Sequence, residues 1–103
     1  MSLEASRAEP HPQEARQRLE DARDSRLAQL RSLDEGGHSA DDHLLSTQKA
    51  AVERVLAEIE EALARVEDGT YGTCLGCARS VPAERLEILP YTRYCVTCRR
   101  RAA

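Results

Sequence analysis

Apolar side chains recur three and four residues apart over residues 44–67, in the stretch LLSTQKAAVERVLAEIEEALARVE. This spacing places them on one face of an α-helix and is typical of a coiled-coil seam over about three heptads. It predicts a helix about 35 Å long at 1.5 Å per residue, ended by a left-handed cap at Gly69. The positions in the seam are Leu45, Gln48, Val52, Val55, Ile59, Ala62 and Val66, of which Gln48 is polar.

A second helical pattern precedes it over residues 13–33, which contain neither Gly nor Pro and are rich in strong helix formers. Pro12 suits the first position of this helix. Arg26 interrupts the apolar stripe, so we expect a narrow seam. The stripe consists of Ala15, Leu19, Ala22, Leu30 and Leu33, with Leu27 alongside.

Residues 34–43, DEGGHSADDH, separate the two helices, because Gly36 and Gly37 stop a helix. Two helices of similar length with a short connection predict an antiparallel hairpin over residues 13–68, with residues 34–43 as its tip. A thin two-stranded coiled coil is one interpretation, and a hairpin that completes a bundle by dimerising is the alternative. Residues 1–12 are polar and contain two prolines, which indicates a disordered tail.

The chain has 103 residues, no Phe and no Trp, and three Tyr as its only aromatics. Such a chain cannot build a thick core, and small scaffolds of this kind depend on disulfides, a metal or a helix–helix seam. No apolar run is long enough to span a membrane, and residues 1–17 lack the features of a secretory signal. We therefore expect a cytoplasmic protein, where thiols stay reduced.

Four cysteines, Cys74, Cys77, Cys95 and Cys98, form the pattern C-x₂-C, seventeen residues, C-x₂-C. This spacing is typical of a zinc site, since two such turns can direct four sulfurs to one tetrahedral ion at about 2.3 Å. The cysteines would fill every coordination position, so the pattern predicts one structural Zn²⁺ and a segment that folds poorly without it.

Other uses of the cysteines are weaker interpretations. A redox pair would need the βαβ context of a thioredoxin-like motif, and a disulfide pair does not suit the cytoplasm. A zinc site that also responds to oxidants stays open as a hypothesis. The sequence contains no nucleophile–base arrangement and no phosphate-binding loop, so we expect no enzyme. His11, His38 and His43 lie in polar segments and are not needed as ligands.

Charge is unevenly distributed along the chain. Residues 1–68 carry 9 basic and 16 acidic side chains, whereas residues 69–103 carry 6 arginines and 2 glutamates. The acidic front disfavours simple binding to duplex DNA. A patch for binding a partner is predicted at the C-terminal arginines, although four thiolates with one zinc would subtract two charges from it. These arginines are Arg93, Arg99, Arg100 and Arg101.

The stretch ALARVEDGTYGTCLGCARSVPAERLEILPYTRYCVTC, residues 62–98, resembles the DksA/TraR family of bacterial transcription factors. The shared elements are DGTYGTCxxC, a motif close to IPxxRLEAxP, and the final CxxC. The resemblance implies a protein that binds RNA polymerase directly, without contacting promoter bases. Its coiled coil would enter the secondary channel, with acidic tip residues near the catalytic magnesium. The zinc unit and C-terminal segment would hold the rim, and some members of the family act with ppGpp.

The chain departs from this family pattern at two places. Ala78 occupies a position that is usually Gly, where a left-handed turn would cost about 1 kcal/mol with Ala. The family's D-x-x-D-x-A motif is absent from the tip, and the D-x-x-D of Asp21 and Asp24 lies within the first helix. The acidic residues available at the tip for regulation are Asp34, Glu35, Asp41 and Asp42.

Together these patterns predict a mainly α fold: an antiparallel two-helix coiled-coil hairpin, then a small four-cysteine zinc-finger unit over residues 69–103 with a short basic C-terminal segment. The predicted function is transcription regulation through RNA polymerase, with ppGpp as a candidate effector and no membrane association. The alternatives are a generic zinc-ribbon module that binds protein or nucleic acid, and a thiol- or zinc-based redox sensor.

Overall fold

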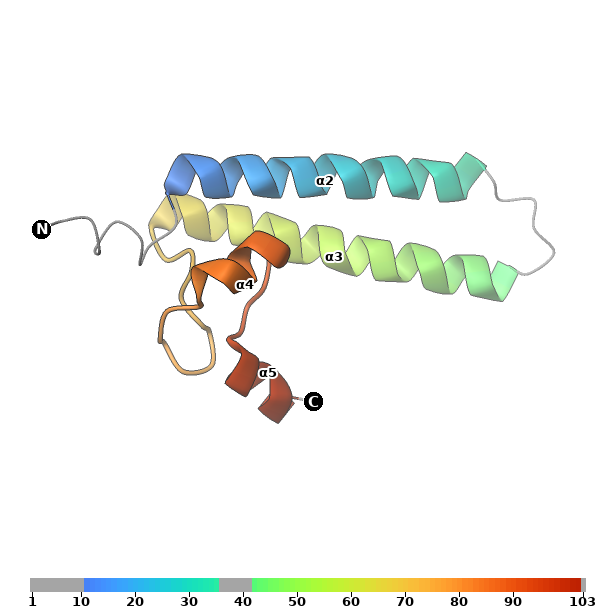
Figure 1. Ribbon diagram of the computed structural model, residues 1–103. Coiled ribbons are helices and arrows are strands. Elements are labelled where there is room, and N and C mark those ends of the chain that lie inside the picture. Colours follow the sequence, from blue (N-terminus) through green and yellow to red (C-terminus); the bar gives the residue numbers. More distant parts are fainter. Residues whose placement is uncertain (1–10, 36–41, 103) are drawn as a thin grey trace, which may run out of the picture.

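The structure is a computed structural model that describes residues 11–35 and 42–102. Two long helices, α2 (Pro12–Glu35) and α3 (Asp42–Asp68), lie side by side and antiparallel. Two short helices follow, α4 (Ala83–Ile88) and α5 (Val96–Ala102). They belong to a compact unit of residues 69–102, here called the zinc unit, which lies beside the end of the hairpin where α2 begins and α3 ends (Figure 1). The predicted mainly helical fold with a cysteine unit after the hairpin is confirmed.

The core of the hairpin lies near its base, at the end that adjoins the zinc unit. Leu19, Ile59 and Ala62 are completely buried there, and they form one cluster. Partly buried side chains from both helices complete it: Ala22, Val55, Leu63 and Val66. The predicted seam is therefore well packed in the half of the hairpin next to the zinc unit.

Farther from the base the seam becomes thin. Val52 is the last buried side chain toward the tip, and α2 has none between residues 20 and 35. Leu27, which the pattern placed beside the stripe, is 41% exposed. Arg26 interrupts the seam as expected, and its guanidinium donates a hydrogen bond to Gln29 at 3.0 Å.

Three ion pairs join the two helices in one consistent antiparallel register. Arg16 pairs with Glu67 at 2.7 Å and Arg23 with Glu60 at 3.5 Å. Both steps, along α2 and back along α3, are seven residues. Eleven residues farther along each helix, Asp34 pairs with Lys49. Because these side chains are partly exposed, solvent screening keeps the contribution of each pair to stability small, and their main effect is to fix the register.

The outer ends of both helices at the base are capped by local chemistry. Pro12 is the first residue of α2, where a missing N–H is tolerated, and the His11 imidazole accepts a hydrogen bond from the Gln13 N–H at 3.3 Å. α3 ends at Asp68, and the φ of 83° at the following Gly69 confirms the predicted left-handed cap. The N–H groups of Thr70 and Tyr71 then bind the Arg65 carbonyl at 3.0 and 3.1 Å.

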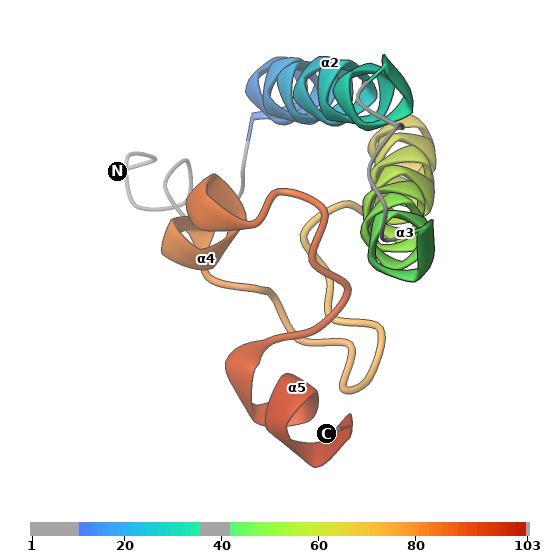
Figure 2. The same cartoon turned by 90° about the vertical axis from the view of Figure 1, so that its right-hand side faces the viewer.

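The zinc unit is attached to α3 through apolar and polar contacts. Tyr71 and Tyr91 pack on the hairpin core cluster, and the Tyr71 hydroxyl donates to the Pro90 carbonyl at 2.8 Å. Arg93 makes a two-pronged ion pair with Glu61 at 2.9 and 2.8 Å. Figure 2 shows how the zinc unit lies beside the hairpin, with α5 farthest from α2. The direction of the hairpin is thus fixed relative to the zinc unit.

Some predicted segments lie outside the described residues. These are the tail up to residue 10, where disorder is predicted, and most of the predicted tip, residues 36–41. None of the helices that the structure describes is long and apolar enough to span a bilayer.

The unequal packing along α2 leads to a first prediction, which compares the same substitution at two positions of one helix. Leu19→Ala should lower the free energy of unfolding by about 2–5 kcal/mol, because Leu19 is fully buried in the core cluster. Leu27→Ala should lower it by less than about 1 kcal/mol, because Leu27 is largely exposed. Urea unfolding of the zinc-loaded protein measures both, and equal losses would contradict this account of the core.

Candidate metal centre

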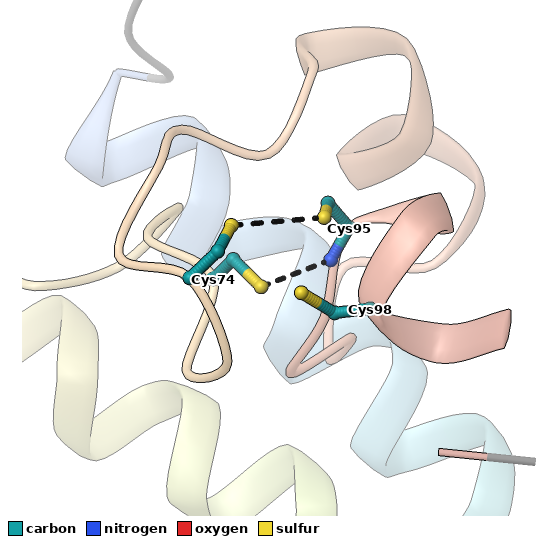
Figure 3. A group of neighbouring side chains, drawn as sticks. Cys74, Cys95 and Cys98 are labelled. Carbon is teal, nitrogen blue, oxygen red and sulfur yellow. Dashed lines mark hydrogen bonds between the residues drawn. The ribbon is translucent and has the colours of Figure 1, made fainter. Parts of the chain in front are cut away.

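The four cysteine sulfurs converge on one point between the loop after α3 and the start of α5. All four Sγ atoms lie within 4.8 Å of one another, and those of Cys77 and Cys95 are 3.9 Å apart. A tetrahedron with Zn–S bonds of about 2.3 Å has edges of about 3.8 Å, so the sulfurs fit one zinc ion. Figure 3 shows Cys74, Cys95 and Cys98 turned toward this point.

The first cysteine pair is presented by a tight turn that closes on itself. The Cys74 N–H donates to the Arg79 carbonyl at 2.8 Å, and the Ala78 N–H donates back to the Cys74 carbonyl at 2.9 Å. An isolated bridge between Thr73 and Ser80 continues the pairing outward. This closed turn directs the sulfurs of both cysteines inward.

Two small residues make this turn possible. Ala78 has a φ of 64°, so the left-handed conformation considered from the sequence is present, with Ala in place of the usual Gly. A Cβ atom added at Gly76 would lie only 3.0 Å from the Cys98 sulfur. Glycine is therefore favoured at position 76, because a side chain there would press on the opposite cysteine pair.

The second cysteine pair is presented by a helix start. Cys95 immediately precedes α5, and Cys98 lies in the first turn of that helix. The Arg99 N–H donates to the Cys95 carbonyl at 2.9 Å. The two pairs are joined by backbone as well, because the Leu75 N–H donates to the Arg93 carbonyl at 2.9 Å.

Backbone N–H groups also act directly on the sulfurs. The Cys95 N–H donates to the Cys74 sulfur at 3.3 Å, as Figure 3 shows, and the Gly76 N–H does so at the same distance. These hydrogen bonds, that from Cys95 first, lower the pKa of the Cys74 thiol to about 6. The hydrogen bond of Cys98 to Cys74, together with burial, raises the pKa of Cys98 to about 12.

The opposite shifts of two neighbouring thiols have a chemical meaning. In the metal-free chain one thiolate is stabilised while a thiol beside it keeps its proton. A zinc ion with four sulfur ligands requires all of them as thiolates, so binding releases protons. All four cysteines are free of disulfide bonds in the structure, which keeps them available for this purpose.

A small apolar shell surrounds the sulfurs. Val81 and Leu86 are almost completely buried and cluster with Cys74. Of the three tyrosines, Tyr71 and Tyr94 pack against this cluster, whereas Tyr91 packs on the hairpin core. Tyr71 contacts both clusters, and burial raises the pKa of its hydroxyl. The centre is thus continuous with the base of the hairpin.

The residues present fit one zinc ion held by Cys74, Cys77, Cys95 and Cys98, as predicted. When bound, such an ion supplies a structural cross-link and no reaction, because four protein ligands leave no position for water or substrate. Nothing in this arrangement supports hydrolysis.

The predicted tip residues that the structure describes lie at the end of the hairpin away from this centre. Asp34 and Glu35 are exposed at the end of α2, and Asp34 pairs with Lys49. Asp41 lies outside the described residues. Asp42 begins α3, but its side chain is not described. A regulatory role for these four acids is taken up below as a proposal.

The four arginines of the predicted basic patch are distributed over different surfaces. Arg93 is engaged by Glu61. It lines, with Arg99, a groove of about 380 Å³ beside α3, whereas Arg101 lines a groove of about 510 Å³ at the cysteines. Arg100 is exposed and lines neither of these two grooves.

The sequence reasoning missed two residues that position the centre. Glu61 holds Arg93, which lies 32 residues away along the chain, and no local pattern indicates such a contact. The second is Gly76, whose close approach to Cys98 becomes apparent only in the packed structure. The C-x₂-C pattern contains a weak signal for it, since only a small residue suits the middle of such a turn.

The left-handed alanine leads to a prediction of increased stability. Ala78→Gly should raise the free energy of unfolding by about 0.5–1 kcal/mol, because glycine removes the left-handed penalty but adds entropy to the unfolded chain. Ala64→Gly, on the exposed face of α3, is the matched control and should lower it by about 1 kcal/mol. Thermal and urea unfolding of the zinc-loaded protein measure both. A loss of stability in Ala78→Gly would show that the turn is not strained.

Metal removal should affect both parts of the molecule. We expect one zinc per chain by elemental analysis, and a chelator should unfold the zinc unit, since the metal supplies much of its folding free energy. The hairpin should then melt at lower temperature, because Tyr71 and Tyr91 no longer cover its core. Far-ultraviolet circular dichroism and the near-ultraviolet tyrosine signal follow the two effects. An unchanged tyrosine signal after zinc loss would contradict this coupling.

Comparison with known proteins agrees with this geometry. Residues 69–102 match the model of the prokaryotic dksA/traR C4-type zinc finger. An uncharacterized protein of Aquifex aeolicus (strain VF5) is 49% identical over 43 residues, which cover 42% of this chain and 30% of that protein. General stress protein 16O of Bacillus subtilis (strain 168) is 38% identical over 66 residues, covering 57% and 40%. The chain thus matches less than half the length of these two relatives.

A solved structure extends the likeness to the hairpin. The transcription factor DksA2 from Pseudomonas aeruginosa superimposes with a TM-score of 0.54 at 23% identity, over 88% of this chain and 76% of that one. At this identity the likeness concerns the fold. The chain therefore carries, at residues 69–102, a zinc finger of the prokaryotic dksA/traR C4-type family, joined to a helical hairpin in the fold of DksA2.

Proposed function

We propose that this chain is a non-enzymatic transcription regulator that binds RNA polymerase directly and inserts its helical hairpin into the secondary channel. The proposal places the protein in the cytoplasm, where bacterial RNA polymerase is found. It requires no contact with promoter bases. The match to the dksA/traR zinc-finger family and the fold shared with DksA2 support the proposal.

The observation that carries the proposal is the shape of the hairpin and its fixed attachment. The described residues extend over 60 × 30 × 21 Å, and α3 alone has 27 residues, about 40 Å at 1.5 Å per residue. The zinc unit lies at one end only (Figure 1). A long hairpin with a broader zinc unit at one end suits a narrow channel, because the zinc unit would stop at the channel entrance and limit the depth of insertion.

The contacts between the zinc unit and the hairpin fix the direction in which the hairpin extends. The Arg93–Glu61 pair and the packing of Tyr71 and Tyr91 on the hairpin core join the two parts by separate contacts. Binding of the zinc unit to the rim would therefore set the direction of the hairpin as well as its position.

The acidic end of the hairpin supports a regulatory effect inside the channel. Asp34 and Glu35 are exposed there, and Asp41 and Asp42 follow within the next seven residues of the sequence. Carboxylates brought close to a magnesium-centred site change its local charge and the pKa values around it. Because the tip lacks the D-x-x-D-x-A motif, the proposal rests on the negative charge of these carboxylates and not on the geometry of that motif.

One observation favours a second candidate, a zinc-ribbon module that binds nucleic acid. Arg99, Arg100 and Arg101 are exposed on α5, and exposed arginines can neutralise phosphates. The acidic hairpin and the charge of a zinc–thiolate cluster oppose this. Titration with single- and double-stranded DNA discriminates: tight, salt-dependent binding in the absence of polymerase would favour the second candidate.

The proposed function predicts that polymerase binding and regulation can be separated. Glu35→Gln with Asp41→Asn and Asp42→Asn should leave binding to core polymerase nearly unchanged, because the zinc unit and the hairpin base are untouched. The same variant should lose most of the effect of the protein on multi-round transcription. Asp24→Asn, which changes one exposed acid midway along α2, is the control and should retain the effect.

The transcription assay should be run with and without ppGpp, so that a role of the alarmone appears as a difference between the two arms. Absence of binding to core polymerase at modest salt would refute the proposed function. Binding with full activity of the tip variant would retain the partner but reject the acidic tip as the acting element.

A further inference from the structure

The groove of about 510 Å³ beside the cysteines, here called the zinc-side groove, brings cations and thiolates together. Its walls include three of the four metal ligands, Cys77, Cys95 and Cys98, and two arginines, Arg79 and Arg101. Within the described part of the chain, neither arginine forms a side-chain hydrogen bond or an ion pair. Two cations without a carboxylate partner thus line the open side of the cysteine cluster.

The fold holds the backbone of both arginines close to the ligands. The carbonyl of Arg79 accepts the Cys74 N–H at 2.8 Å, which makes this residue part of the turn that presents the first pair. Arg101 follows Cys98 by three residues on α5, so the two residues share a face of the helix. The position of each arginine follows from the same backbone that positions the sulfurs.

Charge gives this arrangement a purpose. A zinc ion with four thiolates carries a net charge of −2, and its ligands Cys77, Cys95 and Cys98 are partly or fully exposed. A groove of this volume is about 10 Å across, well below the Debye length of about 30 Å at 0.01 M salt. At low ionic strength both exposed arginines therefore act on the cluster with little screening. We propose that Arg79 and Arg101 offset the negative charge of the zinc–thiolate cluster and thereby strengthen zinc retention.

This role differs from that of an arginine in a partner-binding patch. The zinc-side groove has no aromatic residue in its lining, and stacking on aromatic side chains is a main source of affinity for single-stranded nucleic acid. The cluster itself is a nearby anion, which would repel a phosphate group. Arg101 therefore acts toward the metal centre, although it is one of three consecutive arginines.

Successive residues of a helix point about 100° apart, and α5 uses this to separate its arginines. Arg101 lines the zinc-side groove, Arg99 lines the groove beside α3, and Arg100 lines neither of these two. Arg100 is therefore a matched control: it carries the same charge on the same short helix, one residue away.

The experiment measures zinc affinity of the full chain by competition with a chromophoric chelator at constant pH and low salt. Arg79→Gln and Arg101→Gln should each weaken zinc binding about three- to tenfold, the range that Coulomb's law gives for one cation roughly 8 Å from a −2 cluster in a water-like medium. Arg100→Gln should change the affinity by less than about twofold, since Arg100 is exposed and does not line the zinc-side groove, so that solvent screens it from the cluster. The zinc-loaded variants are compared by circular dichroism to verify the fold.

Two further arms separate charge from structure. Arg79→Lys and Arg101→Lys keep the charge and should bind zinc nearly as the unchanged chain does. In 1 M salt, where the Debye length is about 3 Å, the effect of the glutamine variants should largely disappear. The proposal is overturned if the glutamine variants equal Arg100→Gln at low salt, if the lysine variants fail to restore affinity, or if the loss persists in 1 M salt.

Discussion

Four sulfurs that must meet at one metal ion determine the structure of the last third of this chain. The segment has few large apolar side chains, and only Val81 and Leu86 form a buried cluster with Cys74. The need to bring two cysteine pairs together explains features that would otherwise be unfavourable. These include Ala78 with a φ of 64° and Gly76, where a Cβ atom would lie only 3.0 Å from the Cys98 sulfur.

The same constraint reaches the hairpin through Tyr71. Its ring packs against both the cysteine cluster and the hairpin core, and its hydroxyl binds the Pro90 carbonyl. Since Leu19, Ile59 and Ala62 form a core too small to be stable by itself, the zinc unit supplies part of its cover. Metal binding, the folding of residues 69–102 and the stability of the hairpin base are therefore one linked equilibrium.

Much of this structure could be predicted from the sequence, because its strongest determinants are local. The three- and four-residue spacing of Val52, Val55, Ile59 and Ala62 indicates a seam wherever the helix packs, and the spacing of the cysteines indicates the metal without any knowledge of the fold. Gly69 ends α3 by a conformational preference of its own. In each case the physical cause lies within a few residues of the effect.

The contacts that orient the parts could not be predicted in this way. The Arg93–Glu61 pair joins residues 32 positions apart, and nothing local distinguishes Glu61 from Glu60, which faces α2 and binds Arg23. The C-terminal arginines form one block in the sequence, yet Arg99 and Arg101 line different grooves. The side on which each charge acts depends on helix phase and on the position of the zinc unit.

The decline of burial along the hairpin has a consequence for its dynamics. The backbone hydrogen bonds near Leu19 and Ile59 are covered by the core, whereas those beyond Val52 are covered mainly by partly exposed side chains and one ion pair. Local opening should therefore begin at the outer end, with amide exchange slowing stepwise toward the base. A binding partner that orders the outer half of the hairpin must offset the loss of conformational entropy there with favourable contacts. Part of the free energy of those contacts thus orders the hairpin and does not contribute to the observed affinity.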